Sequence, residues 1–177
     1  MTSSEQHTVD SAQPPRHIVV MGVSGSGKTT LARILAEDLN LPMAEADEFH
    51  PPENIAKMSS GEPLTDADRW PWLRRLESWM SARWSTGCII TCSALRRSYR
   101  DVLREAQGDV VFLHVAVETP LLSTRLKHRS GHFMPPELLD SQLASLEPLH
   151  PDEEGITLAN DASVDQLVAA AKNFIQQ

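Results

Sequence analysis

The hydrophobic residues of this chain fall into short runs that are apolar at nearly every position, separated by longer amphipathic segments. The runs cover residues 18–21, 88–92, 110–117 and 156–159, and a further short extended run stands at 41–46. A strand that is apolar throughout is buried on both faces, and such strands belong to parallel sheets covered by helices. The pattern therefore predicts an α/β fold of three layers, with five parallel strands alternating with helices.

The segments between these runs carry apolar residues at helical spacing, together with signals for helix ends. We expect helices at about 30–39, 66–83, 97–105, 119–127, 136–146 and from 164 onward, and a helical turn at 53–58. Thr65 and Asp68 have the spacing of a capping box. Thr119 and Pro120 predict an N-cap and the first residue of a helix. Residues 47–52 are polar and end in two prolines, so a loop is expected there.

The composition indicates a single globular domain. The chain has 177 residues, of which 41% are hydrophobic, enough for one core. Residues 1–16 are polar, acidic and contain prolines, so we expect a disordered tail rather than a signal peptide, followed by the domain at 17–177. No apolar run approaches the roughly 20 residues of a membrane span, so no membrane partner is expected and the predicted location is the cytoplasm. Cys88 and Cys92 lie about 13 Å apart on one predicted strand, too far for a disulfide, and are expected to be free thiols.

The charge restricts the class of ligand. The formal net charge is −8 at pH 7. A surface of this sign repels nucleic acid, so no nucleic-acid partner is expected, and any bound anion has to be held by a local basic pocket. This favours a small phosphorylated ligand.

Residues 22–29 fit the phosphate-binding motif G-x-x-x-x-G-K-[ST], the P-loop, and stand between the first predicted strand and the first predicted helix, as that motif requires. The glycines allow backbone N–H groups to converge on phosphate oxygens, and the start of the helix adds its positive dipole end. Lys28 is expected to reach the β- and γ-phosphates of ATP, and the Thr29 hydroxyl to bind Mg²⁺. The predicted nucleotide-binding residues are Gly22, Ser24, Gly25, Ser26, Gly27, Lys28, Thr29 and Thr30.

Polar residues follow several of the other predicted strands, and ligands of parallel sheets bind beyond the carboxyl ends of the strands. This rule selects residues 47–50, 93–97 and Glu118. Asp47 is the best-placed acid, able to accept the proton of an attacking hydroxyl or to hold Mg²⁺ through water; capping a turn or helix is the alternative. His50 is either a ligand or a solvent-exposed loop histidine.

Arg125 and Arg129 are four residues apart on one face of a predicted helix that leads into a glycine-bearing segment. A lid over about 125–136 would bring such an arginine to the transferring phosphoryl group and exclude water, whereas a solvated helix face is the alternative. The same two interpretations apply to other basic residues, among them Lys57, Arg69 and Arg96. From the residues alone, the chain is predicted to be a P-loop phosphotransferase with a small acceptor.

A set of short motifs extends through the chain: Asp47-x-x-His50-Pro51, Asn54, Lys57-Met58, Gly61-x-Pro63-Leu64, Asp66, Asp68-Arg69, Pro71-Trp72-Leu73, Cys92-Ser93-Ala94-Leu95-Arg96, Tyr99-Arg100 and Gly131-His132-Phe133. In these motifs the sequence resembles the gluconokinase family, over about residues 17–175. The resemblance implies ATP-dependent phosphorylation of D-gluconate at its 6-hydroxyl, giving 6-phospho-D-gluconate and ADP. It also implies Mg²⁺ as a cofactor and a homodimer.

The chemistry of the implied substrate, together with the strand-end positions, leads us to expect roles for individual residues. The acceptor site is expected to use Asp47, His50, Lys57, Arg69, Ser93 and Arg96, and catalysis to depend on Lys28, Asp47, Arg125 and Arg129. Asp47 is expected to meet the reacting hydroxyl. Arg69 or Arg96 would bind the carboxylate of gluconate. His50 and Lys57 would hold the chain of hydroxyls between these ends.

Two departures and two alternatives accompany this interpretation. Glu45 stands where some gluconokinases have aspartate, which leaves open whether this carboxylate touches the metal. The predicted lid has Met134-Pro135-Pro136 after Phe133 in place of a run of lysines. The alternative functions are another small-molecule kinase of the same build, resembling shikimate or nucleoside monophosphate kinases, and an ATP-binding regulator without turnover.

Overall fold

The computed structural model describes residues 14–128 and 138–177 of the chain. Its centre is a five-stranded sheet in the order β2-β3-β1-β4-β5, in which every neighbouring pair is parallel. The strands are β1 Arg16–Met21, β2 Met43–Glu45, β3 Cys88–Cys92, β4 Asp109–Ala116 and β5 Gly155–Ala159. The predicted α/β fold with a five-stranded parallel sheet is therefore confirmed.

The helices alternate with the strands as expected. They are α1 Lys28–Leu39, the short 3₁₀ helix η1 Ala46–Phe49, α2 Pro52–Ser59, α3 Asp66–Ser81, α4 Arg97–Arg104, α5 Thr119–Lys127, α6 Leu138–Ser145 and α7 Val164–Ile175. Thr65 and Asp68 form the predicted capping box at the start of α3. Residues 129–137, which include most of the predicted lid and Arg129, lie outside the described residues.

Two local expectations need correction. Residues 46–49, most of which were expected in a loop, form η1, because the His50 N–H donates to the Asp47 carbonyl oxygen at 3.3 Å and closes a tight turn. Glu118, not Thr119, is the N-cap of α5. Pro120 still lies in the first turn, where its missing N–H costs no hydrogen bond, so the helix can begin one residue earlier than the proline suggested.

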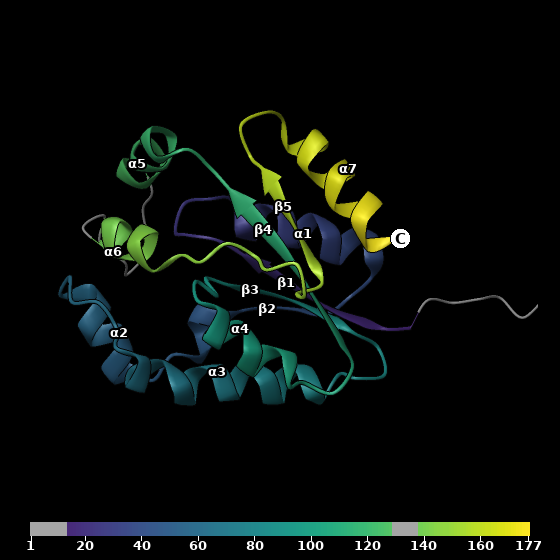
Figure 1. Ribbon diagram of the computed structural model, residues 1–177, viewed down its shortest axis with the longest axis horizontal. Helices are drawn as coiled ribbons and strands as arrows, with labels where there is room; N and C mark the ends of the chain where they lie inside the picture. The colour runs from purple at the N-terminus through teal and green to yellow at the C-terminus, as the bar shows by residue number, and fades with distance from the viewer. Residues whose placement is uncertain (1–13, 129–137) are drawn as a thin grey trace, which may run out of the picture.

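Alternate residues of the strands face two separate cores, one on each side of the sheet. On one side Ile18 and Val20 of β1 are fully buried under α1 and α7. On the other side Val19 and Met21 are buried under α3 and α4. Figure 1 shows these two helix layers with the sheet between them. Cys88 and Cys92 are free, buried thiols of the second core, as expected.

The carboxyl ends of the strands meet several helices and loops at one end of the fold. The strand arrows point toward α2, α5 and α6, which gather at this end of the molecule (Figure 1). Met21, the last residue of β1, pairs with Cys92 of β3 and with His114 of β4. The N–H of Gly22 then donates to the carbonyl oxygen of Ser93 at 3.3 Å, so the loops after β1 and β3 begin side by side. None of the helices in the described ranges is both long and apolar enough to cross a membrane.

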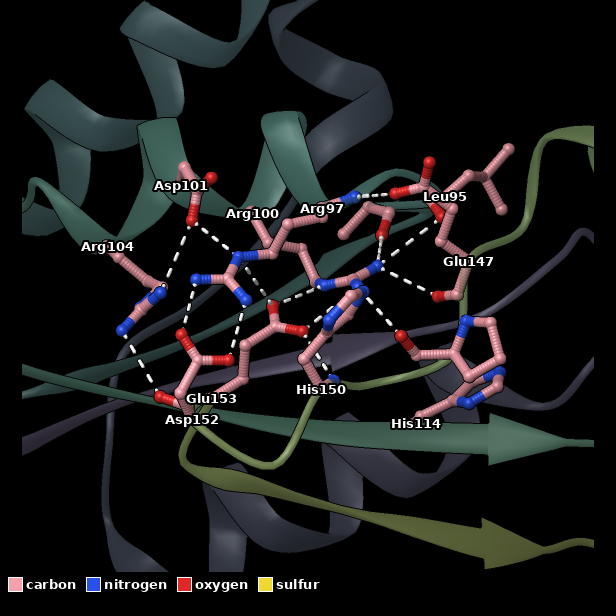
Figure 2. Close-up of polar contacts among 12 residues, drawn as sticks. Leu95, Arg97, Arg100, Asp101, Arg104, His114, Glu147, His150, Asp152 and Glu153 are labelled. Atoms are coloured by element: carbon pink, nitrogen blue, oxygen red, sulfur yellow. Dashed lines mark hydrogen bonds and ion pairs between the residues drawn. The ribbon is translucent and has the colours of Figure 1, made fainter.

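A buried ion pair links the start of α4 to the segment that precedes β5 (Figure 2). Arg100 of α4 donates through Nε to Glu153 Oε1 at 2.6 Å, and both side chains are 0% exposed. Arg100 also donates to four main-chain carbonyl oxygens at 3.0 to 3.3 Å, those of Ala94, Leu95, Glu147 and Pro148. Burial opposes ionisation of Glu153, but hydrogen bonds from Arg100 and from the His150 amide outweigh it and hold the pKa of Glu153 below its ordinary value. The loop after β3 is thereby tied to the segment that joins α6 to β5.

Glu153→Gln is expected to lower the free energy of unfolding by about 3–5 kcal/mol, because it leaves the buried Arg100 charge without its partner. The adjacent Asp152 provides a matched control, since its carboxylate pairs with Arg97 at 2.7 Å but is 64% exposed. Asp152→Asn should have a much smaller effect, because an exposed pair is screened by solvent. Urea unfolding of both variants measures the difference, and equal losses of stability would contradict the structural role of the buried pair.

Candidate active site

A cavity of about 410 Å³ opens at the carboxyl ends of the strands. It lies between the P-loop, η1, the start of α3, the end of β3, α6 and the segment after β5. Many of the predicted site residues meet on its wall: Ser24, Gly25, Gly27, Lys28, Thr29, Thr30, Asp47, His50, Arg69, Ser93 and Arg125. Residues from distant parts of the sequence are thus brought together by the parallel sheet, as the strand-end rule predicts.

The P-loop has a backbone shape that requires glycine. Gly22 has φ 145° and Gly27 has φ 102°, values that favour glycine. A Cβ at Gly22 would lie 2.7 Å from the carbonyl oxygen of Val115, and one at Gly27 would lie 2.5 Å from Asn160 Nδ2. Gly22 and Ser26 are buried within the P-loop and do not line the cavity. The hydroxyl of Ser26 is buried and has no hydrogen-bond partner within the described part of the chain.

Side chains from three elements hold the P-loop in this shape. Lys28 Nζ lies 3.0 Å from the carbonyl oxygens of both Gly22 and Val23. Asn160, which follows β5, donates through Nδ2 to the Ser26 carbonyl oxygen at 2.8 Å. Arg125 of α5 reaches the same oxygen at 3.4 Å. The cations therefore lie at the loop before any phosphate is bound, which is the arrangement expected of a preformed anion site.

The residues present fit a polyphosphate with Mg²⁺. The curled backbone of the P-loop and the N-terminus of α1 converge where the phosphates of a nucleotide would lie. Mg²⁺ that binds phosphate uses only one or two protein ligands. The Thr29 hydroxyl and the Asp47 carboxylate stand on the same cavity wall and suit that role. No cluster of three or more metal-ligating His, Cys, Asp or Glu side chains occurs among the described residues.

His50 is a buried, neutral histidine on this wall. Its ring stacks on the Trp72 ring, with centroids 4.1 Å apart and 14° between the planes. Burial, together with the positive charge of Arg69, lowers the pKa of His50 from 6.5 to about 4. The solvent-exposed alternative for His50 is therefore wrong, because only 9% of the residue is exposed.

Arg69 enters the cavity from α3 with its guanidinium held by neighbours. Its NH1 donates to the Leu64 carbonyl oxygen and lies 3.2 Å from the Tyr99 hydroxyl. Its Cζ lies 5.3 Å from the centroid of the Tyr99 ring, a cation–π distance. An arginine fixed in this way presents a preorganised positive group to the cavity.

Lys57 and Arg96 lie elsewhere, each beside an acidic residue. Lys57 Nζ is 2.8 Å from Asp68 Oδ2, and this hydrogen bond raises the pKa of Lys57. Arg96 NH1 is 3.6 Å from Asp66 Oδ2. Glu118, the N-cap residue of α5, does not line the cavity, and its side chain makes no capping hydrogen bond. Neither Lys57 nor Arg96 is part of the cavity wall. Their roles in binding the acceptor stay predictions.

Two residues of the wall were missed from the sequence. Asn160 follows β5, so the strand-end rule would have selected it had it been applied to the fifth strand. Gln142 of α6 accepts a hydrogen bond from the Ser24 N–H through Oε1 at 2.7 Å. The sequence around Gln142 carries no signal for this contact, because the helix reaches the P-loop only through the tertiary fold.

A parallel sheet with a P-loop after its central strand, and a polar pocket beside that loop, defines the class of P-loop small-molecule kinases. Correspondingly, a family model described as shikimate kinase matches residues 24–173. The chain is 46% identical to a gluconokinase of Gluconobacter oxydans over 162 residues, which cover 90% of this chain and 91% of the relative. A crystal structure of a gluconokinase from Sinorhizobium meliloti is similar, with a TM-score of 0.81, 42% identity, and coverage of 93% of this chain and 94% of that chain. A sugar kinase structure from a Janibacter species has a TM-score of 0.87 and 55% identity, covering 92% and 95% of the two chains. The chain belongs to the gluconokinase family.

The low pKa of His50 predicts a pH dependence of stability. Between pH 6.5 and about 4 the unfolded ring binds a proton that the folded ring does not, so the free energy of unfolding falls as the pH is lowered through this range. Above pH 6.5 both states are neutral and the contribution is constant. His50→Gln should reduce the loss of stability between about pH 7 and about pH 5 by roughly 1 kcal/mol, allowing for partial solvent screening. Urea unfolding at both values measures this, and identical losses in the two proteins would contradict a buried neutral ring.

Proposed function

We propose that this protein phosphorylates D-gluconate at its 6-hydroxyl with ATP, giving 6-phospho-D-gluconate and ADP. The observation that carries the proposal is one cavity that combines a preformed P-loop with Asp47, His50, Arg69 and Ser93. Gluconate is a carboxylate with a row of hydroxyls, so an arginine together with neutral donors and acceptors matches its chemistry. Membership of the gluconokinase family supports the same substrate.

The sheet order separates the nucleotide from the acceptor. The P-loop follows β1, which is the central strand. Asp47 and Ser93 follow β2 and β3 on one side, whereas Ala162 and Val164 line the cavity after β5 on the other. The apolar residues after β5 suit a nucleotide base, and the polar residues after β2 and β3 suit a polyol. The γ-phosphate would then point from the P-loop toward Asp47.

The chemistry requires positioning and charge compensation. Lys28 compensates the charge that develops on the β- and γ-phosphates, and Thr29 would hold Mg²⁺, which would supply further positive charge for the same compensation. Asp47 accepts the proton of the 6-hydroxyl as its oxygen attacks the γ-phosphorus, and the bond from that phosphorus to the bridging oxygen breaks, so that ADP leaves. Glu45 lies on the same wall, and its Oε1 is 3.7 Å from Arg33 NH2. Its negative charge is therefore partly compensated by Arg33.

Arg69 is the residue that best suits the carboxylate of gluconate. It reaches the cavity, whereas Arg96 is paired with Asp66 outside the cavity wall. His50 supplies a neutral contact to the hydroxyls. Ser93 lies beside the P-loop and completes the acceptor side.

The proposed enzyme also has a lid over the phosphates and acts as a dimer. The predicted lid over about 125–136 would bring Arg125 and Arg129 to the phosphates, and Arg125, at its start, lies against the P-loop. The domain begins at Arg16, the first residue of β1, one residue before the boundary at 17 expected from the sequence. The protein acts as a homodimer in the cytoplasm, and its net charge of −8 favours small anionic substrates over nucleic acid.

ADP release with Mg²⁺ and ATP is expected to be stimulated by gluconate but not by shikimate or nucleoside monophosphates. A phosphorus NMR spectrum should assign the product as a primary phosphate ester. Asp47→Asn is expected to keep ATP affinity while lowering turnover at least about a hundredfold, because the base is lost. If another acceptor stimulated ADP release and gluconate did not, that acceptor would be the substrate in place of gluconate. A lack of turnover with every acceptor would favour an ATP-binding regulator.

Arg69→Lys is expected to raise the KM for gluconate about tenfold while leaving the KM for ATP unchanged, because lysine cannot form the bidentate contact with a carboxylate. Arg96→Lys is the matched control and should change either constant less than about twofold. Sorbitol, which has no carboxylate, should be a poor acceptor for the wild type and for the Arg69 variant alike. If Arg96→Lys raised the KM for gluconate more than Arg69→Lys did, Arg96 and not Arg69 would be assigned to the carboxylate of gluconate.

A further inference from the structure

Asn54 is a buried polar residue of α2 that the proposed chemistry does not use. It is 3% exposed and lies between His50 and α3. Its Nδ2 lies 3.0 Å from the Asp68 carbonyl oxygen and 3.3 Å from His50 Nδ1. Both contacts are made by the same amide nitrogen, which has two N–H groups to give.

The Asp68 contact fixes the orientation of the Asn54 amide. A main-chain carbonyl oxygen can only accept, so the Asn54 atom that faces it must be the nitrogen. The same nitrogen then donates its second N–H toward His50. Because an N–H donor faces Nδ1, this ring nitrogen must be the acceptor. A neutral imidazole with an unprotonated Nδ1 carries its proton on Nε2.

The ring is fixed in direction as well as in protonation. It stacks on Trp72, and the Trp72 indole N–H donates to the Ala46 carbonyl oxygen at 2.8 Å. A proton on Nδ1 would point at the Asn54 N–H, so both the cation and the other tautomer are disfavoured. Nε2 has no hydrogen-bond partner within residues 14–128 and 138–177, and the ring lies on the cavity wall.

We propose that Asn54 is a positioning residue that holds His50 as a hydrogen-bond donor through Nε2, so that His50 binds a hydroxyl oxygen of the acceptor as a donor only. The role toward the acceptor rests on the proposed function. A hydroxyl that accepts from His50 has to give its own proton to another group. The site therefore recognises the direction of a hydroxyl's hydrogen bonds as well as its position.

The tautomer can be measured without any activity. Long-range ¹H–¹⁵N correlation spectra of the wild-type protein near neutral pH, with the His50 signals assigned by their loss in His50→Gln, should show an unprotonated Nδ1 and a protonated Nε2. In Asn54→Asp a carboxylate replaces the donor, so Nδ1 should become protonated. A protonated Nδ1 in the wild type would overturn the proposal, even if the Asn54 variant failed to fold.

Kinetics then separate positioning from a purely structural role. Asn54→Asp is expected to raise the KM for gluconate about tenfold, with the KM for ATP changed less than about twofold. In a His50→Gln background the same substitution should add less than about twofold, because its effect acts through His50. An equal increase in both backgrounds would overturn the positioning role.

The control for these measurements is Glu53→Gln, an exposed change at the adjacent residue, which should match the wild type in spectra and kinetics. If the wild type showed the Nε2–H tautomer but did not phosphorylate gluconate, the proposed function would fail while the role of Asn54 toward His50 would stand. The two failures are therefore distinguishable.

Discussion

The buried Arg100–Glu153 pair is the constraint on which both sides of the cavity depend. It joins α4 and the loop after β3 to the segment between α6 and β5 (Figure 2). Ala94, at the start of that loop, has φ 45°, a left-handed conformation that costs an L-residue about 1–2 kcal/mol. A hydrogen bond from Arg100 to the Ala94 carbonyl oxygen offsets this cost. Ser93, next to Ala94, is thereby held beside the P-loop.

The cavity has several positively charged side chains on its wall, although the molecule as a whole is negatively charged. The chain carries a net charge of −8, yet Lys28, Arg69 and Arg125 all face one cavity. Two anionic substrates have to enter the same space, and three cations compensate them locally. His50 stays neutral beside Arg69, because burial disfavours the charged ring and a further positive charge would repel the arginine. The acceptor side of the cavity thus presents a charged group, Arg69, and a neutral group, His50.

The fold was predictable because the inner strands β1 and β3 are buried on both faces and nearly free of charged residues, and the P-loop was predictable because its glycines and Lys28 have a fixed spacing. The strand-end rule also placed Asp47 and Ser93 in the site. The directions of long side chains were not predictable. Lys57 and Arg96 are close in sequence to residues that line the cavity. Their side chains instead pair with Asp68 and Asp66, and neither is part of the cavity wall. Gln142 reaches the P-loop from a helix more than a hundred residues away in the chain, a contact that only the tertiary fold creates.

The backbone hydrogen bond from Gly22 to Ser93 has a consequence for how acceptors can change during evolution. It links two loops that follow neighbouring strands, so the offset between phosphate donor and acceptor is set by the spacing of the strands, about 4.8 Å. Side chains after β2 and β3 can therefore be exchanged without moving the phosphate. Substrate choice and the geometry of phosphoryl transfer become separate properties of the chain, and a new acceptor needs a new pocket but not a new reaction.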